Sequence, residues 1–176
     1  MRRKIIAVVG AAECARGVPL WRLAHALGRQ LAQAGYRVLT GGLGGVMEAA
    51  LAGARAATSY AEGDTLAILP SFAPDCANAY ADIVVATGMD VHMNAVVANS
   101  DAVIAVGGGA GTLCEIAMAW ERGRPVLACH RVGGSSARVA ELCKAAGCHA
   151  PLYPVATARE AVAVLSRVLR ETGADV

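Results

Sequence analysis

The sequence of 176 residues has few charged side chains, almost no excess of charge of one sign and no long apolar run. Charged residues make up 17% of it, against roughly 25% in an average domain, and its net charge is +2. Nucleic-acid-binding proteins need basic residues clustered on one face, which this charge balance does not favour. No stretch approaches the roughly 18 consecutive apolar residues of a membrane span. We therefore expect neither nucleic acid nor a membrane as a partner.

The cysteines also lack a functional pattern, because no C-x-x-C pair and no metal-ligand spacing occurs. Residues 1–4 lead into a strand-like segment without the long apolar region and cleavage site of a signal peptide. We expect a cytoplasmic protein without a metal site, whose cysteines are free thiols that act as small apolar side chains. The six are Cys14, Cys76, Cys114, Cys129, Cys143 and Cys148.

Apolar residues are abundant, at 56% of the sequence with a mean hydropathy of +0.46. A chain of this length fits one domain with a sizeable core, so we expect a single domain over residues 1–176. The apolar surplus predicts that some of these side chains lie in a subunit interface, and hence a homo-oligomer.

The most informative stretch joins a buried strand, a glycine-rich turn and a helix. Residues 102–106 are apolar throughout and β-branched at three of five positions, which favours a strand buried on both faces. The glycines that follow allow left-handed angles and a close approach to a ligand. The helix predicted from Thr112 presents unpaired N–H groups and the positive end of its dipole, which suit a phosphate. The four glycines are Gly107, Gly108, Gly109 and Gly111.

A second stretch repeats this pattern. A short strand at 36–40 leads directly into Gly41-Gly42-Leu43-Gly44-Gly45, and a helical segment at 46–54 follows. Two strand–glycine turn–helix units in one small domain make chance a poor explanation. We predict that this turn contributes to the same ligand site through Gly42, Gly44 and Gly45.

The rest of the chain alternates strands and helices, which predicts an α/β fold: a Rossmann-like, doubly wound parallel sheet of about seven strands with helices on both faces. Ligands bind beyond the carboxyl ends of such strands, where both glycine turns lie. We expect a surface loop at 71–80 over or beside these turns. The predicted strands are 4–10, 36–40, 65–69, 81–86, 102–106, 124–129 and 148–153. The predicted helices begin at 19, 46, about 90, 112, 137 and 157. The helix that begins at about 90 follows a turn at 87–90 and reaches Ser100.

Glu115 has two interpretations. The segment Thr112-Leu113-Cys114-Glu115 fits a T-x-x-E capping box, in which the glutamate bonds to the N–H of the cap residue and stabilises the helix start. Alternatively, Glu115 is an acid–base group beside the bound anion.

Several motifs together resemble the LOG-like Rossmann superfamily, whose members were once labelled lysine decarboxylases. They are GGLGGVMEAALAGA at 41–54, TGM at 87–89, SDAVIAV at 100–106 and VGGGAGTLCEIAMAWERGRPV at 106–126. The combination is most similar to the branch that includes the molybdenum cofactor carrier proteins. This resemblance implies a non-catalytic, tetrameric carrier that binds the cofactor, a pterin with a terminal phosphate, and delivers it to molybdoenzymes such as nitrate reductase.

The alternative that the resemblance implies is a phosphoribohydrolase, which splits a nucleoside 5′-monophosphate into base and ribose 5-phosphate. Glu115 matches the catalytic glutamate of those enzymes. They also use an arginine after the TGM motif, where this chain has His92-Met93-Asn94. Met93 cannot bind an anion as arginine does, so we favour a site without catalytic residues. The predicted ligand-binding residues are Gly42, Gly44, Gly45, Gly107, Gly108, Gly109, Ala110, Gly111, Thr112 and Glu115.

Overall fold

The computed structural model describes residues 2–146 and 151–171 and contains a seven-stranded, all-parallel sheet. The strand order is β4-β3-β2-β1-β5-β6-β7, so the order reverses between β1 and β5. This confirms the predicted fold class and number of strands. The strands are β1 Ile5–Gly10, β2 Arg37–Thr40, β3 Thr65–Leu69, β4 Ile83–Ala86, β5 Ala102–Val106, β6 Val126–Cys129 and β7 Leu152–Val155. The start of the last predicted strand, 148–150, lies outside the described residues.

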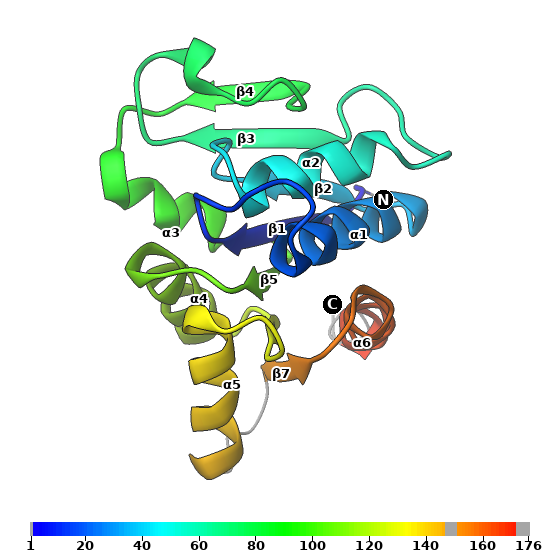
Figure 1. Ribbon diagram of the computed structural model, residues 1–176, viewed down its shortest axis with the longest axis vertical. Helices are drawn as coiled ribbons and strands as arrows, with labels where there is room; N and C mark the ends of the chain where they lie inside the picture. The colour runs from blue at the N-terminus through cyan, green and yellow to red at the C-terminus, as the bar shows by residue number, and fades with distance from the viewer. Residues whose placement is uncertain (1, 147–150, 172–176) are drawn as a thin grey trace.

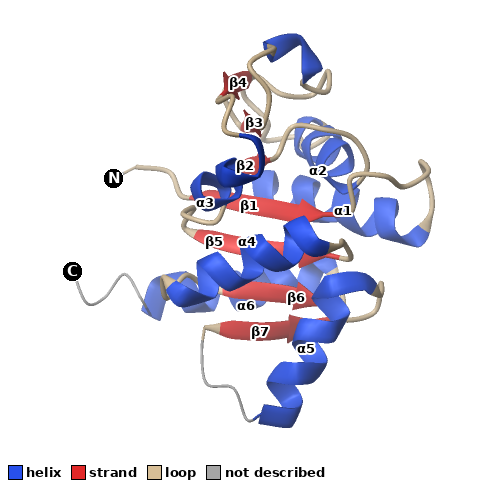
Figure 2. Cartoon of the chain, turned by 90° about the vertical axis from the view of Figure 1, so that its left-hand side faces the viewer, coloured by secondary structure: helices blue, strands red, loops and turns tan. Residues whose placement is uncertain are grey.

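Helices cover the two faces of the sheet in separate layers (Figures 1 and 2). One layer consists of α1 (Pro19–Gln33), α2 (Val46–Arg55) and α6 (Ala158–Glu171). The other consists of α3 (Asn94–Val97), α4 (Ala110–Glu121) and α5 (Gly134–Ala146). Short 3₁₀ helices, η1 (Pro74–Cys76) and η2 (Asp90–Met93), lie in the connections on either side of β4. Each layer packs on its own apolar cluster, which confirms the doubly wound arrangement.

The alternation of side chains along the central strands produces these two clusters. In β1, Ile6 and Val8 face the α1–α2 layer, whereas Ala7 and Val9 face the α3–α4 layer. All five residues of β5 are buried, as expected for a strand covered on both faces. The central strands therefore form a rigid platform whose carboxyl ends position the turns that follow them.

The helix predicted to reach Ser100 is much shorter than expected. Asp90 has a φ of 48°, η2 follows it, and α3 then comprises only four residues. The N–H groups of Asn99 and Ser100 donate to the carbonyls three residues earlier, which tightens the end of the helix into a 3₁₀ turn. As a result, no long helix within residues 2–146 and 151–171 covers the α3–α4 face of β3 and β4 (Figure 2).

Four cysteines are free within the described residues, Cys14, Cys76, Cys114 and Cys129, whereas the side chains of Cys143 and Cys148 lie outside them. No group of histidine, cysteine, aspartate or glutamate side chains in 2–146 and 151–171 is placed to hold a metal ion. Nor does any helix in those ranges have the length and apolar character that crossing a bilayer requires.

Candidate phosphate-binding site

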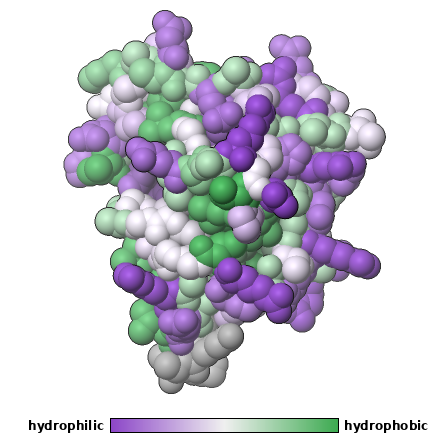
Figure 3. Space-filling model, viewed as in Figure 1, coloured by the Kyte–Doolittle hydropathy of each residue, from purple (hydrophilic) through white to green (hydrophobic). Residues whose placement is uncertain are grey.

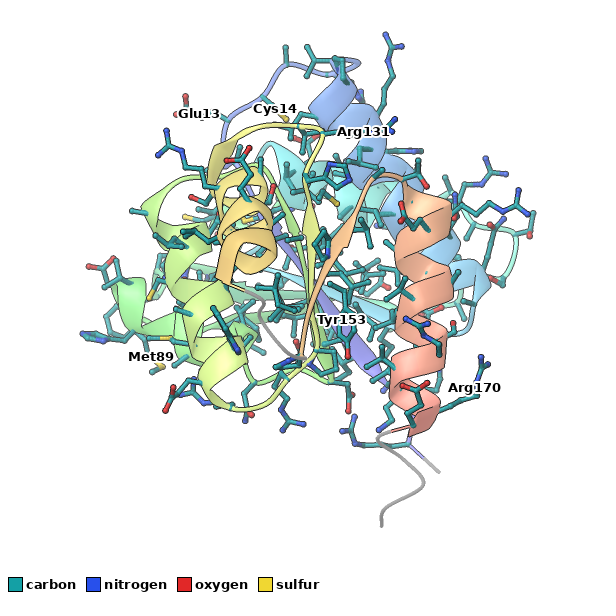
Figure 4. The ribbon with its side chains drawn as sticks, turned by 90° about the horizontal axis from the view of Figure 1, so that it is seen from below. Glu13, Cys14, Met89, Arg131, Tyr153 and Arg170 are labelled. Atoms are coloured by element: carbon teal, nitrogen blue, oxygen red, sulfur yellow. The ribbon has the colours of Figure 1, made fainter. Side chains whose placement is uncertain are left out.

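The connections that follow β1, β2 and β5 meet at one edge of the sheet. These strands are neighbours, and all of them run in the same direction, so their carboxyl ends lie together. Figure 4 shows Glu13 and Cys14, which follow β1, at the same end of the molecule as Arg131, which follows β6. Arg170, near the end of α6, lies at the opposite end. The fold thus brings both glycine-rich turns to one edge.

The turn after β5 leads into α4 two residues earlier than predicted, at Ala110 rather than Thr112. Leu113 is the first residue of the helix whose N–H has a backbone partner, the carbonyl of Gly109 at 3.0 Å. The preceding N–H groups, from Gly109 to Thr112, have no hydrogen-bond partner within the described chain. Gly109, Ala110 and Gly111 are also exposed, so these donors are open to an anion.

Two serines at the start of α5 form hydrogen bonds with this turn. Ser136 Oγ accepts the N–H of Gly107 at 2.8 Å and donates to the carbonyl of Cys129 at 2.7 Å. Ser135 donates its N–H to the carbonyl of Gly108 at 2.9 Å and its hydroxyl to that of Gly109 at 2.8 Å. The turn's carbonyls are therefore bonded to α5, which leaves its outer N–H groups available to a ligand.

No local sequence pattern connects these two serines with the site, because Ser135 and Ser136 are 26 and 29 residues away from the glycines that they bond. Pairing of β5 with β6 brings them there. The only signal in the sequence was a serine pair directly after two glycines, which is typical of a helix cap.

The turn after β2 has a different structure. The N–H of Gly42 donates to Thr40 Oγ1 at 3.1 Å, and a Cβ on Gly42 would lie 2.6 Å from the side chain of Leu69. Gly45 has a φ of 62°, and a Cβ there would overlap the backbone of Ala11. Gly42 and Gly45 are buried, and their lack of a Cβ is required by the packing of the chain itself.

The segment 71–80 lies beside the turn after β2, as predicted. Asn78 donates its backbone N–H to the carbonyl of Gly42 at 2.8 Å. The Nδ2 atom of Asn78 donates to the carbonyls of Gly42 at 3.0 Å and Leu43 at 2.9 Å. The carbonyls of this turn are thus also bonded internally.

A pocket of about 220 Å³ lies between the two turns. Four of the predicted residues line it: Gly109, Gly111, Thr112 and Glu115. Gly42, Gly44, Gly45, Gly107 and Gly108 do not line it, although they shape the turns on either side. Ala110 faces an adjacent hollow of about 340 Å³, together with Gly108, Ser135 and Arg138. The other lining residues are Gly10, Ala11, Ala12, Leu43, Met47, Met93 and Asn94.

The capping-box interpretation of Glu115 is wrong. The N-cap of α4 is Gly109, which has no side chain and so cannot form the reciprocal bond of a capping box. Glu115 is therefore in the second turn of the helix, too far along to reach the cap residue. Its side chain is 7% exposed and makes no hydrogen bond or ion pair within the described residues. Burial raises the pKa of the Glu115 carboxyl to about 8.

Met93 lies in the wall of the same pocket as Glu115. It is buried and packs near Gly41 and the sulfur of Met47. No lysine, arginine or histidine is among the residues that line this pocket in the described chain. Any anion held there must therefore be bound by backbone N–H groups rather than by cationic side chains.

The sequence of this site and its fold are shared with a known family. The model of the SLOG cluster4 family matches residues 3–161. The chain belongs to the SLOG cluster4 family. A relative described only as uncharacterized, from Archaeoglobus fulgidus, is 42% identical over 127 residues, which cover 72% of this chain and 80% of that protein. Membership in this family agrees with the resemblance to the LOG-like superfamily.

Solved structures of similar fold include two proteins described by their ligand. The molybdenum cofactor binding protein of Rippkaea orientalis has a TM-score of 0.81 and 28% identity, covering 96% of this chain and 99% of that one. The molybdenum cofactor carrier protein of Chlamydomonas reinhardtii has a TM-score of 0.78 and 28% identity, with the same coverage. At that identity, this SLOG cluster4 chain is a relative of the algal carrier and not the same protein.

Proposed function

We propose that this protein binds the molybdenum cofactor, holds its terminal phosphate at the start of α4, and carries it to molybdoenzymes such as nitrate reductase. Two structural relatives of nearly full coverage are described as binding or carrying that cofactor. The observation that carries the proposal is the row of unpaired N–H groups from Gly109 to Thr112 at the edge of a pocket. A phosphate at a helix N-terminus satisfies such donors and interacts favourably with the helix dipole.

Two glycines in this row support the presence of a ligand. Neither Gly109 nor Gly111 has a positive φ, and a Cβ added to either would meet no atom of the chain within 4 Å. Glycine is therefore not needed there for folding, and Gly111 even lowers helix stability relative to alanine. A group that approaches the backbone closely is a physical reason for both residues.

The size of the pocket limits which part of the cofactor it encloses. Its volume of about 220 Å³ is below the roughly 300–1,000 Å³ of sites that enclose whole ligands. We infer that the pocket takes the phosphate end, while the pterin lies outside it.

The phosphoribohydrolase alternative has less support. Cleavage of the glycosidic bond requires stabilisation of developing charge, and the pocket wall contains Met93 in place of the arginine. Glu115, the other candidate group, is buried and has no hydrogen-bond or ion-pair partner in the described chain that would orient it. We propose a carrier in which no bond is broken.

The test combines retention, transfer and turnover. Purified protein is incubated with molybdenum cofactor, desalted, and assayed for its ability to restore cofactor-free nitrate reductase; a parallel sample with AMP is assayed for free adenine. We expect retention and transfer without base release. Gly111→Val should abolish retention because its side chain fills the phosphate position. Ala117→Val, an exposed site on the same helix, is the matched control. Release of adenine that disappears in Glu115→Ala would overturn the carrier proposal.

We further propose that the protein is a homo-oligomer, a tetramer as the family resemblance implies, in which the uncovered face of β3 and β4 contacts another subunit. Ile83 and Val85 pair with Leu66 and Ile68, which face the α3–α4 side of the sheet. Ile83 and Val85 are 43% and 45% exposed. Figure 3 shows hydrophobic side chains mixed with hydrophilic ones at the top of the molecule, where β4 lies, and a denser hydrophobic area near the centre of the view. A second subunit would replace the missing helical layer.

Light scattering coupled to size-exclusion chromatography tests this interface. Val85→Lys should shift the protein toward smaller assemblies, because a charged side chain loses its solvation in an apolar contact. Leu142→Lys changes an even more exposed apolar residue on α5, away from β4, and should leave the assembly unchanged. A wild-type protein that is monomeric at micromolar concentration would exclude the interface.

A further inference from the structure

Glu115 lines the pocket but has no role in the phosphate site proposed above. Its side chain is more than nine-tenths buried, lines the pocket, and has no hydrogen-bond or ion-pair partner in the described chain. Buried polar groups are normally paired, so an unpaired carboxyl that borders a pocket needs an explanation. A ligand atom in the pocket would supply such a partner.

The position of Glu115 determines what that partner can be. It lies one helical turn beyond Thr112, whose N–H is one of the open donors at the start of α4. A group in the pocket that accepts those N–H bonds would therefore lie near the carboxyl. An ionised carboxylate has only acceptor oxygens and would repel an anion there, whereas a protonated carboxyl has one O–H donor.

No neighbouring charge favours the ionised form. The turn after β1 provides Gly10, Ala11 and Ala12 to the pocket, and α2 provides Met47. The segment of η2 and α3 provides Met93 and Asn94, which are also uncharged. Burial and the charge of Glu48 raise the pKa of the Cys14 thiol, but neither Cys14 nor Glu48 contributes to the raised pKa of Glu115.

We propose that Glu115 remains a neutral carboxylic acid and donates its O–H to a phosphate oxygen of the bound ligand, so that it selects tetrahedral oxyanions and couples their binding to its own protonation. This inference rests on the proposed phosphate site. It assigns Glu115 neither to catalysis nor to helix capping. The raised pKa of its carboxyl, about 8, agrees with a neutral group at physiological pH. A bound anion would raise that pKa further, because like charges disfavour ionisation.

The predicted pH dependence has a definite direction. Below pH 8 the free protein already holds the proton, so affinity for the anion should be constant. Above pH 8 the proton must be taken up from solution when the anion binds. Linkage then predicts a dissociation constant that rises about tenfold between pH 7 and pH 9.

Inorganic sulfate is a suitable probe, because it remains a dianion throughout this range and the ligand itself contributes no titration. Binding can be followed by NMR of the methionine methyl groups, since Met47 and Met93 line the pocket. We expect the wild-type dissociation constant to rise about tenfold between pH 7 and pH 9. Glu115→Gln, which keeps a donor but cannot titrate, should bind with wild-type affinity at pH 7 and show no such rise.

Two control variants exclude other groups. Glu121→Gln removes an exposed glutamate at the end of the same helix, and Cys14→Ser removes a partly buried thiol in the segment after β1; both should keep the wild-type pH profile. An equal rise in Glu115→Gln and the wild type would overturn the role of Glu115 and leave the phosphate site intact. Glu115→Gln that folds but binds sulfate more than tenfold less tightly at pH 7 would also overturn it. Absence of sulfate binding at every pH would exclude the phosphate site, and this inference with it.

Discussion

The two glycine-rich turns look alike in the sequence but differ in what requires their glycines. In the turn after β2, Gly42 and Gly45 are buried, have positive φ angles, and leave no space for a Cβ. In the turn after β5, Gly109 and Gly111 are exposed, have ordinary φ angles, and face open space. The first turn thus needs glycine for packing, whereas in the second turn these two glycines serve no purpose within the chain.

The first turn, after β2, is therefore structural, whereas the second turn, after β5, forms the surface that we propose binds the ligand. The first turn fits against Ala11 and fixes the position of α2, with the N–H of Val46 donating to the carbonyl of Ala11 at 2.9 Å. The second turn is hydrogen-bonded to two serines of α5, and its N–H groups that lack a partner face outward. A glycine that the fold does not need is therefore better evidence for a ligand than one that it does need.

The largest effect on stability should come from Gly45→Ala. The new Cβ would overlap the backbone of Ala11, and the residue would keep an unfavourable φ of 62°. We expect a loss of roughly 2–5 kcal/mol in the free energy of unfolding, from backbone strain and overpacking together. Urea denaturation followed by circular dichroism measures it.

Gly35→Ala is the matched control for this substitution. Gly35 follows α1 with a φ of 84°, but a Cβ there would meet no atom within 4 Å. This variant isolates the cost of the positive φ, about 1 kcal/mol. Equal losses in the two variants would show that the contact between the first turn and Ala11 is not tight.

Glu115→Gln should have the next largest effect, and it should raise the free energy of unfolding rather than lower it. Its pKa is about 8 in the folded protein and near 4.5 in the unfolded chain. Only the unfolded chain releases the proton between these values, so the stability that Glu115 contributes is complete below pH 4.5 and declines up to pH 8. Glu115→Gln should therefore be more stable than the wild type at pH 7, by roughly 3 kcal/mol, and equal to it near pH 4.

Denaturation of both proteins across this pH range tests the sign. Comparing the two removes the contributions of Asp82 and Asp101, whose lowered pKa values make both proteins less stable in acid. A difference in stability that does not change with pH would show that Glu115 is ionised in the folded protein.

Local sequence patterns predicted most of the fold because each pattern reports on one strand or helix. The buried run of β5 and the apolar stripe of α1 correspond to observed elements. The prediction that failed was a helix to Ser100, because the chain turns at Asp90 and the residues after α3 form a short 3₁₀ turn before β5. Tertiary connection overrode local preference there.

The site was less predictable because its properties are set by contacts between distant segments. The glycine pattern alone could not distinguish Gly45, which packs on Ala11, from Gly111, which faces a pocket. The T-x-x-E pattern suggested a capping box, but α4 begins at Ala110 and Glu115 faces the pocket instead. Ser136 is in the first turn of α5, and nothing in the local sequence links it to the turn after β5.

An intermediate effect is expected for Ser136→Ala. Ser136 is fully buried, and its hydroxyl joins Gly107 to Cys129 through two hydrogen bonds. Its removal leaves a buried N–H and a buried carbonyl without this partner, which should cost about 1–3 kcal/mol. Because the second turn depends on this support, amide hydrogen exchange should accelerate at residues 107–112 and remain unchanged at residues 41–46. Uniform acceleration in both turns would contradict the separation between them.

The smallest effect on stability should come from Gly111→Ala, which tests the comparison most directly. The added methyl group meets no atom of the chain, and alanine is the better helix former, so stability should stay the same or rise by up to about 1 kcal/mol. Affinity for sulfate should nevertheless fall by about tenfold, or roughly 1.4 kcal/mol, because the methyl group occupies space beside the open N–H groups. Thermal unfolding and the methyl NMR titration measure the two quantities on the same sample. Gly45→Ala should thus lower stability, whereas Gly111→Ala should lower only the affinity for sulfate. An unchanged sulfate affinity in Gly111→Ala would leave this glycine without a function and remove the main distinction between the turns.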